Sequence, residues 1–284
     1  MMKHKKGLRA AGLIFKYLLL AFLGLILIFP LIYMFFGSFK SNQEIFGTLK
    51  LLPESFHPEG YIEGWKGSGQ ITFGAYIWNS FLLVVPTVAL TVVSSILTAY
   101  GFNRFRVPGR KVLFAVMMAL MMLPASVLLI PRYLLYVSFG WIDTYLVFWV
   151  PAACATSSFF VYMFVQFFEG VPRELDEAAR IDGCSSFQTL VRILVPLSKP
   201  AVISAVIFQF IWTWNDFFQQ YVYISSVGKY TVSLGLRMAL DATSAIQWKN
   251  ILAMSVIAMV PCTLIYFVLQ RYFVEGIATS GLKG

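Results

Sequence analysis

Long apolar runs separated by short polar stretches dominate this chain of 284 residues. A membrane-spanning helix needs about 20 mainly apolar residues. We expect six such helices, at about 13–37, 74–102, 112–137, 142–168, 200–224 and 250–270. Hydrophobic residues make up 59% of the chain and charged residues 12%, so no soluble domain could bury this apolar surface. The pattern predicts an all-α polytopic membrane protein with a single domain over residues 1–284.

Basic residues collect on one side of the predicted helices. Fifteen of the 22 Lys and Arg residues fall in the two termini and in the loops on that side, which the positive-inside rule makes cytoplasmic. The net charge of +9 is therefore explained by topology and not by binding to nucleic acid. The first apolar run is too long for a signal peptide, so we expect an uncleaved helix and a multi-pass protein of the bacterial plasma (inner) membrane with both termini cytoplasmic.

One strongly polar segment, residues 172–196, interrupts this apolar pattern between the fourth and fifth predicted helices. It carries a helix of its own at about 173–182, with acidic residues in the first turn and a basic one near the end, as the helix dipole favours. Gly183 can take the left-handed conformation that stops a helix. Ser185 and Gln188 then form a capping box that starts a second helix.

This segment resembles the EAA loop of ABC-importer permeases, whose pattern is E-A-A, three residues, G, nine residues, then I-x-L-P. The positions that match are Glu177, Ala178, Ala179, Gly183, Ile193 and Pro196, with Val195 where the pattern has Leu. Two further stretches, 99–111 and 270–284, resemble the second cytoplasmic loop and the C-terminal tail of carbohydrate-importer permeases of the maltose-transporter type. The resemblance covers nearly the whole chain and disfavours the alternative, an amphipathic helix that only lies on the membrane.

The resemblance implies a type I ABC importer permease, one transmembrane subunit of an ATP-driven, binding-protein-dependent importer of sugars or oligosaccharides. Such a subunit forms half of the translocation path. The implied partners are a second homologous permease, two cytoplasmic ATPase subunits and an extracytoplasmic solute-binding protein, with lipid around the helices. The residues implied in coupling to the ATPase are Glu177, Ala178, Ala179, Asp182 and Gly183.

Catalytic motifs are missing from the sequence. There is no G-x-x-x-x-G-K-[ST] phosphate loop, and the only two histidines, His4 and His57, lie far apart. We therefore expect no enzyme activity, no metal site and no bound cofactor in this chain. ATP and Mg would bind to the partner ATPase subunits.

Polar and aromatic residues recur along the fifth predicted helix at steps of three and four, which predicts one wet helix face: Gln209, Trp212, Asp216, Gln219 or Gln220, and Tyr223. A charge deep in a span costs about 2.5–3.5 kcal/mol, so Asp216 should face a cavity or a partner. Aromatic rings beside amide groups suit a sugar, whose C–H faces stack while its hydroxyls form hydrogen bonds. The alternative is helix–helix contact at the permease interface.

Three basic residues bear on the charge of the substrate. Arg132 lies near the outer end of the third predicted helix, where it either reaches the membrane interface or contacts an anionic sugar. With Arg237 and Lys229 it favours an acidic oligosaccharide only weakly. The sequence does not name the sugar, and glycerol phosphate is a further possible substrate within the family.

A self-sufficient secondary transporter or channel is the alternative from another class. Proton coupling would need a chain of acids or histidines inside the membrane, and only Asp216 is present. A membrane-embedded enzyme would need an acid–base pair or a metal set, which the sequence lacks. Pro86, Pro124, Pro151 and Pro261 are predicted to kink the spans.

Overall fold

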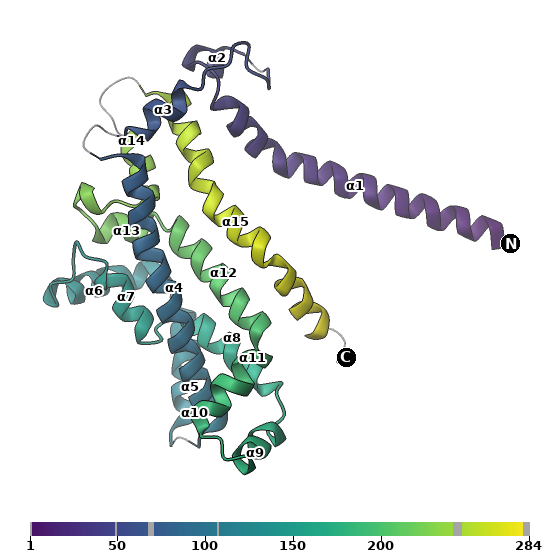
Figure 1. Cartoon of the computed structure of the whole chain (residues 1–284), viewed down its shortest axis with the longest axis vertical. Helices are drawn as coiled ribbons and strands as arrows, with labels where there is room; N and C mark the ends of the chain where they lie inside the picture. Colours follow the sequence, from purple (N-terminus) through teal and green to yellow (C-terminus); the bar gives the residue numbers. More distant parts are fainter. Residues whose placement is uncertain (1, 49, 68–70, 107, 241–245, 281–284) are drawn as a thin grey trace. The chain divides into compact units, whose positions relative to one another are not determined.

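The computed structural model describes residues 2–48, 50–67, 71–106, 108–240 and 246–280, and every regular element in these ranges is a helix (Figure 1). The longest helices are α1 (Met2–Gly37), α4 (Phe73–Arg104) and α15 (Trp248–Ser280). The others are α2 (Asn42–Gly47), α3 (Glu59–Trp65), α5 (Arg110–Met121), α6 (Ala125–Ser138), α7 (Leu146–Ala153), α8 (Ser158–Glu169), α9 (Glu174–Ile181), α10 (Ser186–Thr189), the π-helix η1 (Leu190–Leu194), α11 (Val195–Leu197), α12 (Lys199–Asn215), α13 (Phe218–Tyr223), the 3₁₀-helix η2 (Val227–Lys229) and α14 (Val232–Leu240).

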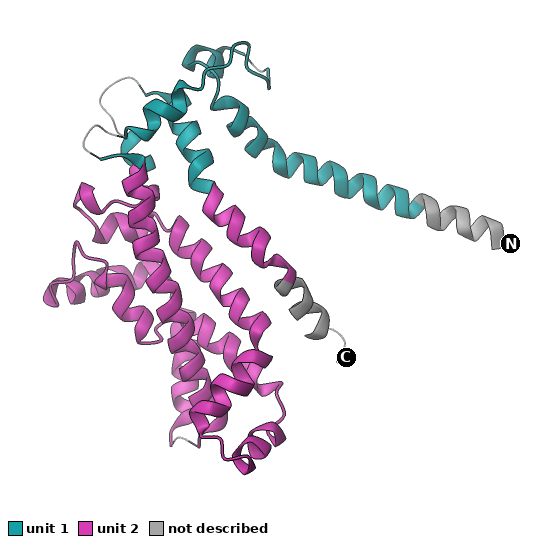
Figure 2. Ribbon diagram, viewed as in Figure 1, with its two compact units in different colours: residues 1–73, 236–259 teal, residues 74–235, 260–284 magenta. Residues whose placement is uncertain are grey.

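The chain divides into two compact units (Figure 2). Unit 1 comprises residues 1–73 and 236–259, and unit 2 comprises residues 74–235 and 260–284. This division concerns packing within each unit, so the single permease domain over residues 1–284 stays a prediction.

The core of unit 2 forms around α8. Phe160, Phe164 and Phe168 recur at steps of four on one face of this helix and are fully buried. Helix α8 packs against α5 and α12. A hydrogen bond of 2.6 Å from Ser94 Oγ in α4 to the Ala152 carbonyl in α7 ties α4 to the same core. This packed core is the scaffold on which the polar loop and the pocket described below are built.

Unit 1 holds α1 and the short helices that follow it. Phe39 stacks on Phe56 with ring centroids 4.3 Å apart, and the fully buried Lys40 ammonium donates a hydrogen bond to the Lys50 carbonyl. Lys249 pairs with Glu63 at 3.2 Å. Residues 12–31 of α1 are exposed, as suits a helix that meets lipid or another subunit.

Four helical stretches in the described residues are long and apolar enough to span a membrane: 12–37, 73–104, 146–169 and 248–271. Two bent helix pairs bring the count to six if each is one span. These stretches overlap the six predicted spans. The expectation of an all-helical membrane protein is confirmed.

Three of the predicted spans are not single continuous helices, and the one at 142–168 is divided into α7 and α8. The one at 112–137 is α5 and α6, which meet at an angle of 105°. Pro124 begins the turn into α6, and because proline lacks an N–H it cannot continue α5. The one at 200–224 ends early, since α12 stops at Asn215 and α13 starts only at Phe218. Residues 186–197 and α12 form the second bent pair, at 79°.

Candidate coupling loop and substrate pocket

The polar segment folds as its sequence pattern predicts, at one end of unit 2 (Figure 1). Helix α9 runs over Glu174–Ile181 against a predicted 173–182, with three acids in its first turn and Arg180 in its last. Glu177, Ala178, Asp182 and Gly183 are exposed. Ala179 is buried, so only Ala178 of the predicted Ala–Ala step faces outward.

The expected helix stop and restart are present. Gly183 has φ +80°, and the Cys184 N–H donates to the Ala179 carbonyl at 2.9 Å, a bond across six residues that closes helix C-termini. Ser185 Oγ accepts from the Gln188 N–H at 3.3 Å, and Gln188 Oε1 accepts from the Ser185 N–H at 2.8 Å. Both predictions from short-range sequence are thus confirmed.

Three large apolar side chains of residues 174–188 remain in contact with solvent: Leu175, Ile181 and Phe187. Ile181 is 86% exposed and Phe187 65% exposed. Exposed apolar groups grouped on a polar loop are typical of a surface that a partner protein covers. We call residues 174–188, with these three side chains and the exposed acids, the coupling surface.

The coupling surface is anchored to the end of α4. Arg104 Nε lies 2.6 Å from Asp176 Oδ2, and Arg104 Nη2 donates to the Val171 carbonyl at 3.0 Å. Arg173 Nη2 donates to the Asn103 carbonyl at 2.9 Å. Burial raises the pKa of the Asp176 carboxyl, and the guanidinium groups of Arg104 and Arg173 oppose that rise.

A second hydrogen-bonded contact joins α4 to the restart of the loop. Tyr100 Oη donates to the Ser186 carbonyl at 2.9 Å, which holds the first turn of α10. We call the three residues Tyr100, Arg104 and Arg173 the α4 clamp. Side-chain contacts therefore join the coupling surface to a long spanning helix.

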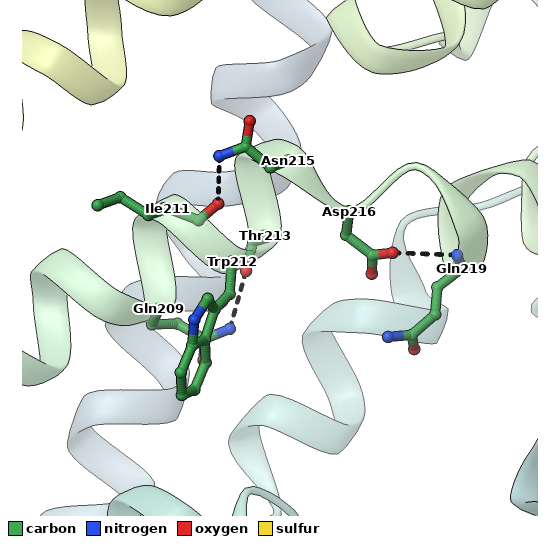
Figure 3. Close-up of a pocket in the computed structure, with 7 residues that line it drawn as sticks. All are labelled: Gln209, Ile211, Trp212, Thr213, Asn215, Asp216 and Gln219. Atoms are coloured by element: carbon green, nitrogen blue, oxygen red, sulfur yellow. Dashed lines mark hydrogen bonds between the residues drawn. The ribbon is translucent and has the colours of Figure 1, made fainter. Parts of the chain in front are cut away.

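An open pocket of about 460 Å³ lies at the end of α12 (Figure 3). The residues that line it are Gln209, Ile211, Trp212, Thr213, Asn215, Asp216 and Gln219. Asp216 sits where α12 ends, and its Oδ1 accepts from the Gln219 N–H at 3.1 Å, which caps the start of α13 (Figure 3). Gln209 donates to Thr213 Oγ1 at 2.8 Å. The pocket thus combines one carboxyl group with amides and an indole ring.

Trp212 connects the pocket to the core. Its ring centroid lies 5.2 Å from that of Phe159 and 5.4 Å from that of Phe160, both at the start of α8, and the ring stacks on Phe208. Half of the side chain is nevertheless exposed. An indole fixed on one face and open on the other is suited to stacking on a flat ligand surface.

The expectation that the polar and aromatic residues from Gln209 to Tyr223 share one helix face is wrong, because the helix is broken after Asn215. Gln220 is buried and its amide donates to the Thr213 carbonyl at 2.9 Å, while its oxygen accepts from Thr231 and Ser233. Tyr223 is buried against Tyr136. Gln209, Trp212, Asp216 and Gln219 remain at the pocket.

The loop after α13 is fastened by Asp143, whose backbone has φ +59°. Its carboxylate accepts from the N–H groups of Ser225 and Ser226 and from Ser226 Oγ, and it pairs with Lys229 at 3.0 Å. Burial opposes ionisation, yet the hydrogen bonds from Ser226, Lys229 and Ser225 hold the pKa of the Asp143 carboxyl well below its usual range. We call this contact the outer clasp.

The outer clasp accounts for one of the three basic residues considered for an acidic substrate. Lys229 is already paired with Asp143, so it is not a free cation. Arg132 is exposed on α6, and Arg237 lies on α14. Neither lines the pocket at the end of α12. The weak preference for an acidic oligosaccharide therefore loses support.

Comparison with known proteins matches residues 91–279 to the family described as binding-protein-dependent transport system inner membrane component. The chain is 33% identical to the probable ABC transporter permease protein YurM of Bacillus subtilis, over 90% of this chain and 84% of that protein. It is 30% identical to the arabinooligosaccharides transport system permease protein AraQ of the same species, over 92% of each chain. It is 32% identical to the sn-glycerol-3-phosphate transport system permease protein UgpE of Brucella abortus, over 92% of this chain and 95% of that one.

A solved structure shares the fold. A chain of a bacterial ABC transporter involved in the import of the acidic polysaccharide alginate superposes with a TM-score of 0.81 at 23% identity, over 92% of this chain and 95% of that one. A chain of the alginate transporter in complex with its pentasaccharide-bound periplasmic protein gives a TM-score of 0.66 at 15% identity, over 94% and 95%. At these identities the likeness concerns the fold alone.

Proposed function

The chain belongs to the family of inner membrane components of binding-protein-dependent transport systems, and from that premise we propose that it forms half of the path of an ATP-driven importer of neutral sugars or oligosaccharides. Members of this family are transport permeases and not enzymes. The observation that carries the proposal is the coupling surface. It is an exposed amphipathic helix with apolar side chains at its edges, attached by the α4 clamp to a spanning helix.

The coupling surface is suited to seat in a cleft of a cytoplasmic ATPase. Ile181 and Phe187 would bury their apolar side chains there, while Glu177 and Asp182 would form hydrogen bonds at the rim. ATP, with Mg, would bind to the ATPase subunits. Closure of the two ATPases would move α9, and the α4 clamp would pass that movement to α4. This is alternating access driven by a ligand that favours one of two conformations.

Further partners follow from the proposed assembly. A second permease would complete the path and would cover part of the apolar surface that this chain exposes, including α1. An extracytoplasmic binding protein would deliver the substrate to the side that carries the outer clasp. In this orientation the chain lies in the bacterial inner membrane, with both termini and the coupling surface in the cytoplasm.

The pocket chemistry favours a neutral sugar. Among the seven residues that line it there is one carboxyl group and no Lys or Arg. A neutral sugar can donate a hydroxyl hydrogen to Asp216 and form hydrogen bonds with the amides of Gln209 and Gln219. The C–H face of its ring can stack on Trp212. A phosphate or uronate would instead meet the Asp216 carboxylate at close range, which is unfavourable because two negative charges repel each other.

Glycerol phosphate is the second candidate, since a relative at 32% identity is named for that substrate. It requires a cationic contact, which Arg132 or a residue of the partner permease would have to supply. The pocket at the end of α12 supplies none.

Uptake by whole cells separates these substrates. A strain with this gene deleted and the same strain carrying the gene on a plasmid are given labelled arabinotriose, an alginate trisaccharide or sn-glycerol 3-phosphate. Gene-dependent uptake of arabinotriose and not of the two anions is expected. Uptake of an anion alone would overturn the preference for a neutral sugar, and uptake that persists after the ATPase genes are removed would overturn the importer class.

A further inference from the structure

The span at residues 146–169 is interrupted near its middle. Helix α7 ends at Ala153 and α8 begins at Ser158, and the residues between them are not helical. Ala155 has φ +53°, a left-handed conformation that residues other than glycine rarely adopt. The carbonyl of Pro151 accepts three hydrogen bonds, from the N–H groups of Cys154 and Thr156 and from Thr156 Oγ1. The interruption is therefore a hydrogen-bonded turn and not a frayed helix end.

This turn leaves backbone acceptors without donors. No described residue donates a hydrogen bond to the carbonyl of Ala153, Cys154 or Ala155. The Thr156 hydroxyl donates its hydrogen to the Pro151 carbonyl, so the Thr156 hydroxyl oxygen can still accept hydrogen bonds. Cys154 and Thr156 are exposed. Within a membrane, backbone groups of this kind persist only where they meet protein or line a water-filled cavity.

The turn lies beside the pocket. Phe159, two residues after the turn, has its ring 5.2 Å from that of Trp212, and Trp212 lines the pocket. The pocket itself surrounds a second interruption, where α12 ends at Asn215 and α13 begins at Phe218. Two adjacent spans of unit 2 are thus broken next to the same tryptophan. Interrupted spans that face each other are a common way to build a polar binding site at membrane depth.

We propose that residues 153–157 form a second wall of the sugar path, in addition to the pocket at the end of α12. The groups that this wall offers are acceptors, namely three carbonyl oxygens and the Thr156 hydroxyl oxygen. A wall of acceptors binds ligands that donate, such as the hydroxyl groups of a neutral sugar. It repels carboxylates and phosphates, which only accept at neutral pH. The inference rests on the proposed function and narrows its substrate class to polyhydroxyl compounds without negative charge.

Cys154 is a native reporter of this wall. 2-(Trimethylammonium)ethyl methanethiosulfonate is a cationic reagent that modifies water-exposed thiols and does not enter lipid, and a wall of acceptors does not repel it. We would treat the assembled importer, purified with its partner subunits, and locate the label on Cys154, Cys184 and Cys262 by mass spectrometry of peptides. The labelling of Cys154 uses the unsubstituted chain, so this measurement does not depend on the folding of a variant. Val116→Cys, an exposed apolar position in the uninterrupted helix α5, is the matched control for a thiol in contact with lipid.

Labelling of Cys154 at a rate within about tenfold of that at Ser55→Cys, an exposed position of unit 1, with Val116→Cys unlabelled, is the expected result. The rate should change between the nucleotide-free state and the state trapped with ATP and vanadate, because the path opens to one side at a time. Absence of label on Cys154 in both states would overturn the proposal. The proposal would also be overturned if Cys154 were labelled in the isolated chain but in neither state of the complex, because the partner permease would then cover the turn.

A pair of variants tests the acceptor chemistry. Thr156→Val removes the hydroxyl oxygen at nearly constant shape, and Thr156→Ser retains it. Arabinotriose uptake should fall several-fold in Thr156→Val and recover in Thr156→Ser, with equal amounts of assembled complex. Equal uptake by both variants would contradict a wall that contacts sugar. Co-purification of an ATPase, recorded on the same samples, separates failure of the importer assignment from failure of this wall.

Discussion

Nε of Arg104, the last residue of α4, lies 2.6 Å from Oδ2 of Asp176 in the coupling helix α9. The Arg104 side chain is 8% exposed and that of Asp176 is 22% exposed, so this ion pair is shielded from water. Removing one partner of a buried pair is strongly destabilising, by about 3–5 kcal/mol when burial is complete. The pair therefore fixes the orientation of the coupling surface relative to a spanning helix.

The first prediction concerns this pair. Arg104→Gln should leave the Asp176 carboxylate uncompensated and release the Val171 carbonyl, at a cost of about 2–3 kcal/mol because burial is partial. We expect sugar transported per ATP hydrolysed to fall, since α9 would move without α4. Arg106→Gln, the same change at an exposed position two residues later, should keep the wild-type ratio. An unchanged ratio in Arg104→Gln would show that the α4 clamp does not transmit motion.

Gly183 provides the second prediction. Its φ of +80° makes any side chain unfavourable by about 1–2 kcal/mol, although a Cβ there would meet no atom within 4 Å. Gly183→Ala should therefore misalign the end of α9 and reduce substrate-stimulated ATP hydrolysis while membrane insertion persists. Gly101→Ala is the control, because that glycine is helical and a Cβ there also meets nothing. Equal hydrolysis by the two variants would contradict this role of Gly183.

The outer clasp gives a prediction about pH. The folded state holds the pKa of Asp143 below its ordinary value, so the clasp stabilises the protein above about pH 4, and this contribution is lost as pH falls towards the lowered pKa. Asp143→Asn should destabilise the complex at pH 7 by about 1 kcal/mol, since the pair is partly exposed. It should also reduce the loss of thermal stability on acidification.

Thermal unfolding in detergent at pH 7 and at pH 3 measures both effects. Asp182→Asn, which removes an exposed acid elsewhere, should leave the pH dependence at the wild-type level. If Asp143→Asn unfolded as the wild type does at both pH values, the clasp would contribute nothing to stability.

The fourth prediction concerns the pocket. Trp212→Ala removes the stacking surface, and Asp216→Asn removes the charge at nearly constant shape, so both should slow arabinotriose uptake by proteoliposomes while assembly persists. Trp78→Ala, at an exposed tryptophan of α4 outside the pocket, is the control for loss of an indole. Normal uptake in both pocket variants, or loss of assembly in Asp216→Asn, would indicate helix–helix contact and not a sugar path.

Local features were predictable because their signals are short. The glycine at 183 and the Ser185–Gln188 capping box are separated from their partners by only a few residues, and both were found as expected. The break after Asn215 was missed, because the spacing of polar residues was read as one continuous helix. Its signal was present, since Asn and Asp readily cap helices and disfavour helix interiors.

Long-range contacts were not predictable from one sequence. Arg104 was counted only as a cytoplasmic charge, and nothing in its neighbourhood points to Asp176, 72 positions later in the chain. Asp143 was not singled out either, because its partners come from the loop after α13. The sequence therefore gives no sign that Lys229 is paired with Asp143. These contacts depend on how distant segments pack together, and the spacing of residues along the sequence carries no information about that packing.

The central claim is that the coupling surface docks an ATPase, and co-purification tests it most directly. The chain, tagged at one terminus and expressed from its own host with its neighbours intact, is purified as wild type, as Glu177→Lys and as Glu169→Lys, and bound ATPase is quantified by mass spectrometry. Glu177 is an exposed acid of the coupling surface, whereas Glu169 is an exposed acid at the end of α8. The account predicts abundant ATPase with the wild type and Glu169→Lys, and at least a tenfold loss with Glu177→Lys, about 1.4 kcal/mol of docking free energy. Equal ATPase in all three samples, or none with the wild type, would contradict it.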